Sequence, residues 1–212
     1  MKRNKRIIIL EIIKEHVVNN KKEYMLVLLL FIIGIFLGVF FINHIQETQK
    51  LEITTYLSTF MEKMKNTETL DYMELLKNSI GQNILLAVVL WFFGTTVIGI
   101  PVVFGLILYR GCCLGYTISV CVTILGLPQG VLFALILLLL QNIIFIPAIL
   151  ALAVSGFKLY KSIIKDRNKE NIKIEVARHT VFSFIMLLLL MVASVIEIFL
   201  STNILKGVIK YF

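Results

Sequence analysis

The residue types that most often bind metal ions or act as nucleophiles are few in this chain. Its histidines stand in three different polar segments, at His16, His44 and His179. Its cysteines are Cys112, Cys113 and Cys121, and none of them has the C-x-x-C spacing of zinc ligands. The sequence also contains no nucleophile elbow, no H-E-x-x-H and no phosphate-binding loop. It therefore predicts no metal site, no cofactor and no enzymatic activity.

Two charged residues, Arg110 and Glu197, stand inside long apolar runs. Where such a run crosses a membrane, a charge near the centre costs about 2.5–3.5 kcal/mol, which makes it a functional candidate by default. At a rise of 1.5 Å per residue, the helices expected here place the two residues about 12 Å apart in depth. A salt bridge between them is therefore disfavoured. Two roles stay open: separate anchoring at the two membrane surfaces, or a buried polar site.

Other polar and small residues in the apolar runs indicate contacts between helices. Gln141 and Asn142 precede Pro147, which frees a carbonyl group four residues back and bends a helix. These polar groups are suited either to bind a neighbouring helix or to line a transport site. Two G-x-x-x-G motifs permit close helix approach; they are formed by Gly34 with Gly38 and by Gly111 with Gly115.

An apolar stripe with helical spacing follows the first apolar run. Its residues repeat at i, i+3, i+4, i+7, i+8 and i+11; they are Ile53, Tyr56, Leu57, Phe60, Met61 and Met64. One interpretation is that the stripe packs on the protein's own surface or on lipid. The other is that it binds a partner through apolar anchors, which are Tyr56, Leu57, Phe60, Met61 and Met64.

The elements that carry these residues follow from the distribution of charge. Hydrophobic residues make up 58% of the 212 residues, which is too much for a soluble domain of this size to bury. Of the 34 charged residues, ten lie in each of the segments 1–23, 43–80 and 158–178, and only four lie elsewhere. Long uncharged stretches between compact charged segments are typical of a polytopic membrane protein.

The number of spans follows from the sign of each charged segment. Segments 1–23 and 158–178 each hold seven basic and three acidic residues, whereas 43–80 holds four basic and six acidic ones. The positive-inside rule places the two basic segments in the cytoplasm, so an even number of spans separates them. The apolar stretches 24–42 and 131–154 each form one span, and 82–126 must form two. Together with 181–204 they make an all-α fold of five transmembrane helices, with the N-terminus inside and the C-terminus outside.

The turn within 82–126 has two candidate positions. Gly99–Pro101 contains turn-forming residues and leaves a complete third span over 102–126. Arg110-Gly111 would place the arginine at the inner surface but would leave a short third span. We favour Gly99–Pro101.

The predicted organisation has six parts. They are a cytoplasmic amphipathic segment (1–23), the first span (24–42), an extracytoplasmic helical segment (43–80), a block of three spans (81–157), a basic cytoplasmic loop (158–178), and the fifth span with a short outer tail (179–212).

This layout resembles the stage II sporulation protein M family over nearly the whole chain. The resemblance rests on five stretches of sequence, which are Gly81–Asn83, Arg110–Gly115, Leu127–Gly130, Gln141–Pro147 and Ala148–Gly156. It implies a non-catalytic scaffold in the septal and engulfing membrane of the mother cell. Such a protein would anchor and localise the peptidoglycan-degrading stage II sporulation proteins D and P during engulfment of the forespore.

The sequence predicts association with the membrane, no nucleic-acid partner and possible homo-oligomers. The alternative function is a small transporter or permease subunit, which requires a water-accessible cavity around Gln141, Asn142 and Arg110.

Overall fold

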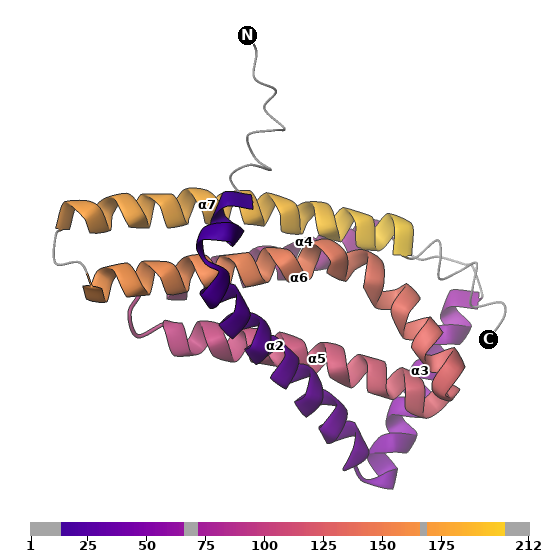
Figure 1. Ribbon diagram of the computed structural model, residues 1–212. Coiled ribbons are helices and arrows are strands. Elements are labelled where there is room, and N and C mark those ends of the chain that lie inside the picture. Colours follow the sequence, from indigo (N-terminus) through magenta and orange to yellow (C-terminus); the bar gives the residue numbers. More distant parts are fainter. Residues whose placement is uncertain (1–13, 66–71, 166–168, 202–212) are drawn as a thin grey trace.

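The computed structural model describes residues 14–65, 72–165 and 169–201, and these residues form helices and no strand. Figure 1 shows the arrangement of the helices. In chain order they are α2 (Lys21–Asn43), α3 (Glu47–Lys65), α4 (Tyr72–Gly94), α5 (Ile100–Leu125), α6 (Leu127–Lys165), α7 (Lys169–Ile196) and the π-helix η1 (Glu197–Ser201). The predicted all-α class is confirmed. The outer tail from residue 202 and most of the amphipathic segment, residues 1–13, lie outside the described residues.

Five of the described helices are long and apolar enough to cross a membrane. They are Lys21–Asn43, Tyr72–Gly94, Ile100–Leu125, Asn142–Lys165 and Asn171–Phe199. Each corresponds to one of the five predicted spans, so the chain is a multi-pass membrane protein by length and composition. The side of the membrane on which each end lies remains a prediction from the positive-inside rule.

The turn between the second and third spans lies at Thr95–Gly99. This position agrees with the favoured turn at Gly99–Pro101, and Pro101 occupies the first turn of α5, where its missing N–H is tolerated. The alternative turn at Arg110-Gly111 is wrong, because both residues lie in the middle of α5. At the other end of α5, Gly126 takes the left-handed backbone angle φ of 82° that glycine tolerates best, and α6 begins at the next residue.

Helix α6 is the centre of the fold. In its spanning part 61% of the residues are buried, against 22–39% in the other four spanning helices. The main buried cluster runs along its segment Phe145–Val154 and includes side chains from α2, α4, α5 and α7. With 39 residues, α6 is about 58 Å long at 1.5 Å per residue, far longer than a hydrocarbon core of about 30 Å. It also changes direction along its length in Figure 1, and Pro147 lies inside it.

The segment 158–178 is not a loop, contrary to the sequence prediction. Helix α6 continues to Lys165 and α7 begins at Lys169, so most of the basic segment is helical. The prediction rested on charge, which shows that a segment lies outside the bilayer but not whether it is helical. A helix can continue from the bilayer into water, as α6 and α7 do here. Lys161 lies within 2.8 Å of Glu23, which joins the two basic segments at one end of the molecule, as the parity argument requires.

Candidate functional site

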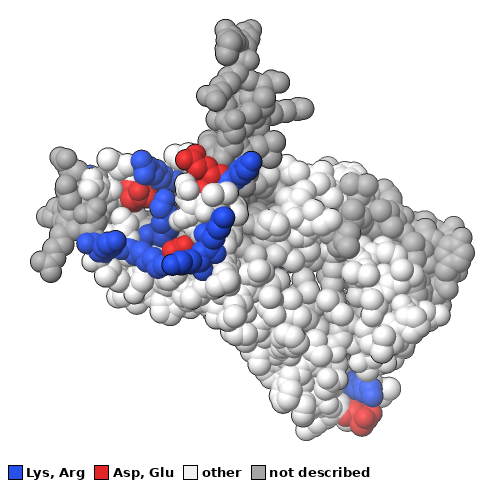
Figure 2. Space-filling model, in the orientation of Figure 1, with Lys and Arg blue, Asp and Glu red and all other residues white. Residues whose placement is uncertain are grey.

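The candidate partner-binding helix, α3, lies at the end of the bundle away from the basic segments. In Figure 1 it extends beyond the ends of α2, α5 and α6. In Figure 2 most visible Lys and Arg side chains gather at the opposite end, where α2, α6 and α7 meet. Tyr56 is 77% exposed on α3. The backbones of Phe60, Met61 and Met64 belong to the same helix, but their side chains lie outside the described residues.

Leu57 differs from Tyr56, although the sequence predicts both as partner anchors. Its side chain is only 9% exposed, and it packs with Cys121 of α5 and with Phe133 and Ala134 of α6. The residue therefore attaches α3 to the bundle and offers no free surface to another protein. Helical periodicity placed both residues on one stripe, but it cannot show that other helices of the same chain already cover Leu57.

The four glycines of the two G-x-x-x-G motifs face each other across α2 and α5. A Cβ atom added to Gly34 or Gly38 would overlap the backbone of α5 at Leu108 or Cys112. A Cβ atom added to Gly111 or Gly115 would overlap the backbone of α2 at Phe31 or Ile35. The two helices are therefore in backbone contact, and only glycine fits at these positions.

Arg110 and Asn142 line a small cavity between α2, α5 and α6. Its volume is about 130 Å³, and Phe145 also lines it. The Arg110 guanidinium carbon lies 5.3 Å from the centroid of the Phe145 ring, within the range of a cation–π contact. The Asn142 amide donates a 2.7 Å hydrogen bond to the Leu138 carbonyl, one turn back on its own helix. The side chain of Gln141 lies outside the described residues. Pro147 follows one turn later on α6.

Glu197 is partnered at the other end of α7. Ser79 of α4 donates a 2.6 Å hydrogen bond to Glu197 Oε2, at the residue where α7 passes into the π-helix η1. Arg110 and Glu197 thus have different neighbours, and no salt bridge joins them within the described part of the chain. The depth argument from the sequence is consistent with this separation.

The structure also joins polar residues that the sequence treated separately. His179 of α7 lies 2.8 Å from Ser155 Oγ of α6 through Nδ1, and 3.4 Å from the Trp91 carbonyl of α4 through Nε2. A carbonyl only accepts, so Nε2–H donates to Trp91 and the Ser155 hydroxyl donates to Nδ1. Gly94 and Gly156 meet at the same crossing, where an added Cβ on Gly156 would lie 2.9 Å from the Gly94 Cα. His179 of α7 therefore contacts both α4 and α6 beside the glycine crossing of those two helices.

Asn83 forms the second polar contact that sequence reasoning missed. Its amide donates a 2.7 Å hydrogen bond to Ser194 Oγ of α7, and both side chains are buried. Asn83 stood out only as part of a family motif, because a single polar residue in an apolar helix gives no indication of its partner. Among the residues described, no group of three or more His, Cys, Asp or Glu side chains is arranged to hold a metal ion.

Comparison with known proteins bears on this architecture. Searches of curated proteins and of solved structures return no match. The family model for stage II sporulation protein M, in contrast, matches residues 27–202, which include all five spanning helices except the first residues of α2. The chain therefore belongs to the stage II sporulation protein M family.

Proposed function

We propose that this chain is a non-catalytic membrane scaffold in endospore formation. It anchors peptidoglycan-degrading partners, the stage II sporulation proteins D and P, and localises them to the septal and engulfing membrane of the mother cell. Family membership and the five spanning helices support a sporulation-related membrane protein. The family is not known as an enzyme family, which favours a binding role over a catalytic one.

The observation that carries the partner-binding role is the exposed position of Tyr56. Helix α3 is attached to the bundle by Leu57, and this attachment leaves the ring of Tyr56 in the open. The hydroxyls of Thr54 and Thr55 are bonded back to carbonyl groups of their own helix, at 2.8 and 2.9 Å. An exposed aromatic ring on a surface whose hydroxyls are already satisfied is suited to an apolar contact with another protein.

The proposal is tested by replacing the exposed ring. We expect Tyr56→Ser to reduce the recovery of the sporulation proteins D and P several-fold when the full-length chain is purified from sporulating cells. The triple change of Tyr56, Phe60 and Met61 to Ser should reduce it further and slow engulfment in membrane-stained cells. Normal recovery and normal engulfment with the triple variant would reject α3 as the docking site.

The matched control is Leu51→Ser. Leu51 is 70% exposed on the same helix, but it lies five residues from Tyr56 and thus about 140° around the helix axis. This change removes a similar apolar side chain from a different face, so we expect recovery of both partners to be unchanged. The amount of each variant in the membrane fraction separates loss of binding from loss of folding.

The second candidate function, a transporter or permease subunit, has one observation in its favour. The cavity lined by Arg110 and Asn142 combines a charged and a polar side chain inside the spanning region. At about 130 Å³ it has room for a few waters rather than for a drug-sized ligand, which needs about 300 Å³ or more.

Cysteine accessibility separates the two functions. The three native cysteines are first replaced by Ser or Ala, and Asn142 or Gln141 is then changed to Cys. If the chain is a scaffold, membrane-impermeant thiol reagents should label neither position, whichever side of the membrane they are added to. Labelling from both sides would favour transport and contradict a purely structural role for this cavity.

A further inference from the structure

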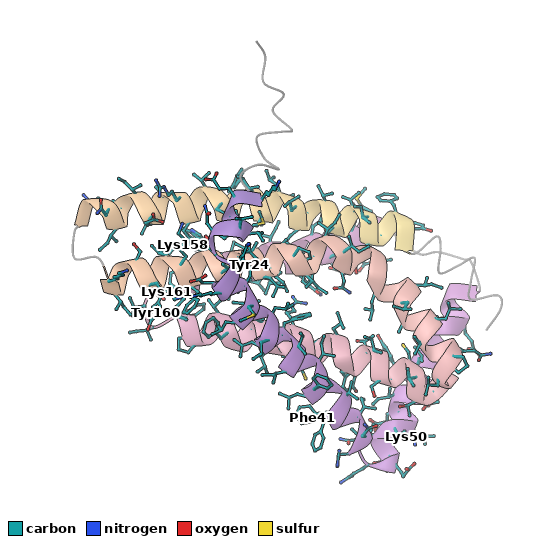
Figure 3. All side chains as sticks on the ribbon, viewed as in Figure 1. Tyr24, Phe41, Lys50, Lys158, Tyr160 and Lys161 are labelled. Carbon is teal, nitrogen blue, oxygen red and sulfur yellow. The ribbon has the colours of Figure 1, made fainter. Side chains whose placement is uncertain are left out.

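A second, larger cavity opens at the basic end of the molecule. Its volume is about 720 Å³, within the range of about 300–1,000 Å³ that is usual for ligand pockets. Its walls come from the segment before α2, from the last turns of the apolar part of α6, and from the first half of α7. Figure 3 shows Tyr24, Lys158 and Lys161 around this crossing of α2 with α6, far from Phe41 and Lys50 at the other end.

The polar part of the wall holds two cations that share one carboxylate. Arg178 Nη1 lies 2.8 Å from Glu175 Oε1, and Lys158 Nζ lies 4.0 Å from Glu175 Oε2. One positive charge is therefore in excess among these three side chains. A second carboxylate, Glu15, also lines the cavity and is exposed to solvent, so the four charged side chains of the wall together carry no net charge. The surrounding surface is the most basic part of the molecule visible in Figure 2.

Apolar side chains of α7 form another part of the wall, beside polar residues such as Asn20 and Ser155. Val181, Phe182 and Ile185 line it from α7, and Val181 is 63% exposed. The His16 ring stacks on Phe182 with a centroid distance of 4.2 Å. Burial and the nearby charge of Lys158 lower the pKa of His16 to about 4, so the ring is uncharged at neutral pH and extends the apolar wall.

The boundary between the two parts coincides with the expected membrane surface. The predicted fourth span ends at Val154, and the predicted fifth span begins at Val181. Lys158 and Arg178 lie just outside these limits, whereas Val181, Phe182 and Ile185 lie inside them. The cavity therefore presents cations at the level of lipid headgroups and apolar side chains at the level of acyl chains.

We propose that this cavity binds an anionic phospholipid, with the phosphate beside Lys158 and Arg178 and the start of an acyl chain along Val181, Phe182 and Ile185. The phosphate replaces or joins Glu175 as the anion between the two cations. A free phosphate would use the same cations but would leave the apolar wall uncovered, which is why we assign the site to a lipid. This assignment is independent of the scaffold function and of the partners proposed above.

The experiment uses the full-length chain in phosphatidylcholine nanodiscs that contain a minor fraction of fluorescent phosphatidylglycerol. We expect Lys158→Gln to weaken phosphatidylglycerol binding about five-fold, as the loss of one cation near an anionic headgroup should. Glu175→Gln should strengthen it, because the carboxylate that competes with the phosphate is lost. Opposite effects from two neighbouring residues cannot result from general unfolding.

The matched control is Lys165→Gln. Lys165 is an exposed basic residue on the same helix, two turns beyond Lys158, and it does not line the cavity. It changes the net charge by the same amount, so we expect less than a two-fold effect (on the order of the scatter expected for surface changes). Equal effects of Lys158→Gln and Lys165→Gln would overturn the site in favour of non-specific attraction of lipid to a basic surface.

Two further measurements separate a lipid from a soluble phosphate. Val181→Asn should weaken phosphatidylglycerol binding, because it makes the exposed part of the acyl-chain wall polar. Glycerol phosphate and inorganic phosphate, added at millimolar concentration, should not displace the lipid. Displacement by either soluble compound, together with no effect of Val181→Asn, would show a free-phosphate site and overturn the lipid assignment. Unchanged binding in both Lys158→Gln and Glu175→Gln would overturn any anion site here.

Discussion

Helices α2 and α5 are joined by a different kind of contact from helices α4 and α7. At the α2–α5 interface two glycines from each helix bring the backbones together, and an added methyl group at any of them would overlap the partner helix. No side-chain hydrogen bond joins these two helices among the residues that the structure describes. The described contacts of this interface are therefore close van der Waals packing and no side-chain hydrogen bonds.

The interface of α4 with α7 and η1 combines buried apolar side chains with hydrogen bonds between side chains. Side-chain hydrogen bonds run from Ser79 to Glu197 at 2.6 Å, from Asn83 to Ser194 at 2.7 Å and from Trp91 to Thr180 at 3.2 Å. His179 adds its contact with the Trp91 carbonyl. The three α4 side chains lie four and eight residues apart, so they follow one face of the helix.

The difference shows two solutions to one physical problem. In a bilayer the apolar surfaces of helices gain little from mutual contact, because lipid chains are equally apolar. Close packing and hydrogen bonds must therefore provide the specificity. At a glycine interface, one larger side chain forces the two backbones apart and so weakens the whole contact. At an interface with several hydrogen bonds, one substitution removes only the bond that it contributes. We thus expect larger effects from single changes at α2–α5 than at α4–α7.

The largest effect is expected from Gly115→Leu. The added side chain would overlap the Ile35 carbonyl of α2, and a backbone carbonyl cannot move away cheaply. We expect a loss of about 3 kcal/mol or more in stability and a strong fall in the amount of folded protein. Thermal unfolding in detergent or nanodiscs measures the loss in stability.

Gly105→Leu is the matched control, since Gly105 lies on the same helix and an added Cβ meets nothing within 4 Å. It should be neutral, or stabilising by up to about 1 kcal/mol, because leucine is the better helix former. If both changes cost the same, glycine flexibility rather than close contact would explain the α2–α5 motif.

A smaller effect is expected from the polar interface. Asn83→Ala removes the bond to Ser194, and we expect a loss of about 1–2 kcal/mol in stability. A double-mutant cycle with Ser194→Ala should give a coupling energy of about 0.6–1.7 kcal/mol. A cost above that of Gly115→Leu would reverse the ranking of the two interfaces.

The contact of His16 with α7 should make stability depend on pH. The folded-state pKa of His16, about 4, lies below the ordinary value of 6.5. Between these values the unfolded chain binds a proton that the folded chain does not, so stability falls as pH decreases through this range. His16→Phe keeps the stacked ring on Phe182 and should flatten this part of the curve. An unchanged slope between pH 6.5 and 4 would assign the acid sensitivity to other groups.

The smallest effect is expected from the ion pair between Lys161 and Glu23. Its distance is 2.8 Å, but half of the Lys161 side chain is exposed. Such pairs contribute about 0–1 kcal/mol and are screened by salt. Glu23→Gln should therefore lower stability only slightly at low salt, and the difference from the unchanged chain should vanish at high salt. A difference that persists at high salt would show that the pair is shielded from solvent.

Particular residues show how far sequence reasoning reached. The turn near Gly99–Pro101 and the separation of Arg110 from Glu197 were predictable, because both follow from the length of helix needed to cross a bilayer. The glycine motifs were visible as spacings, but each pair was identified without its partner. The burial of Leu57 and the hydrogen bond of Asn83 were not predictable, since each depends on a residue more than 60 positions away.

The number of spans and the grouping of the two basic segments at one end could be predicted from the amino-acid sequence alone. Both follow from the free-energy cost of placing charge in hydrocarbon. This cost is a sum over residues that are neighbours in the sequence, so it can be calculated without knowing the fold. The folded structure was needed to show which helices pair, how α3 is attached, and that the segments around His16, Lys158 and Arg178 enclose one cavity. Hydropathy shows that each of the five helices can cross a membrane, but it says nothing about which helices pair. The shapes of their facing surfaces and a few hydrogen bonds determine the pairing.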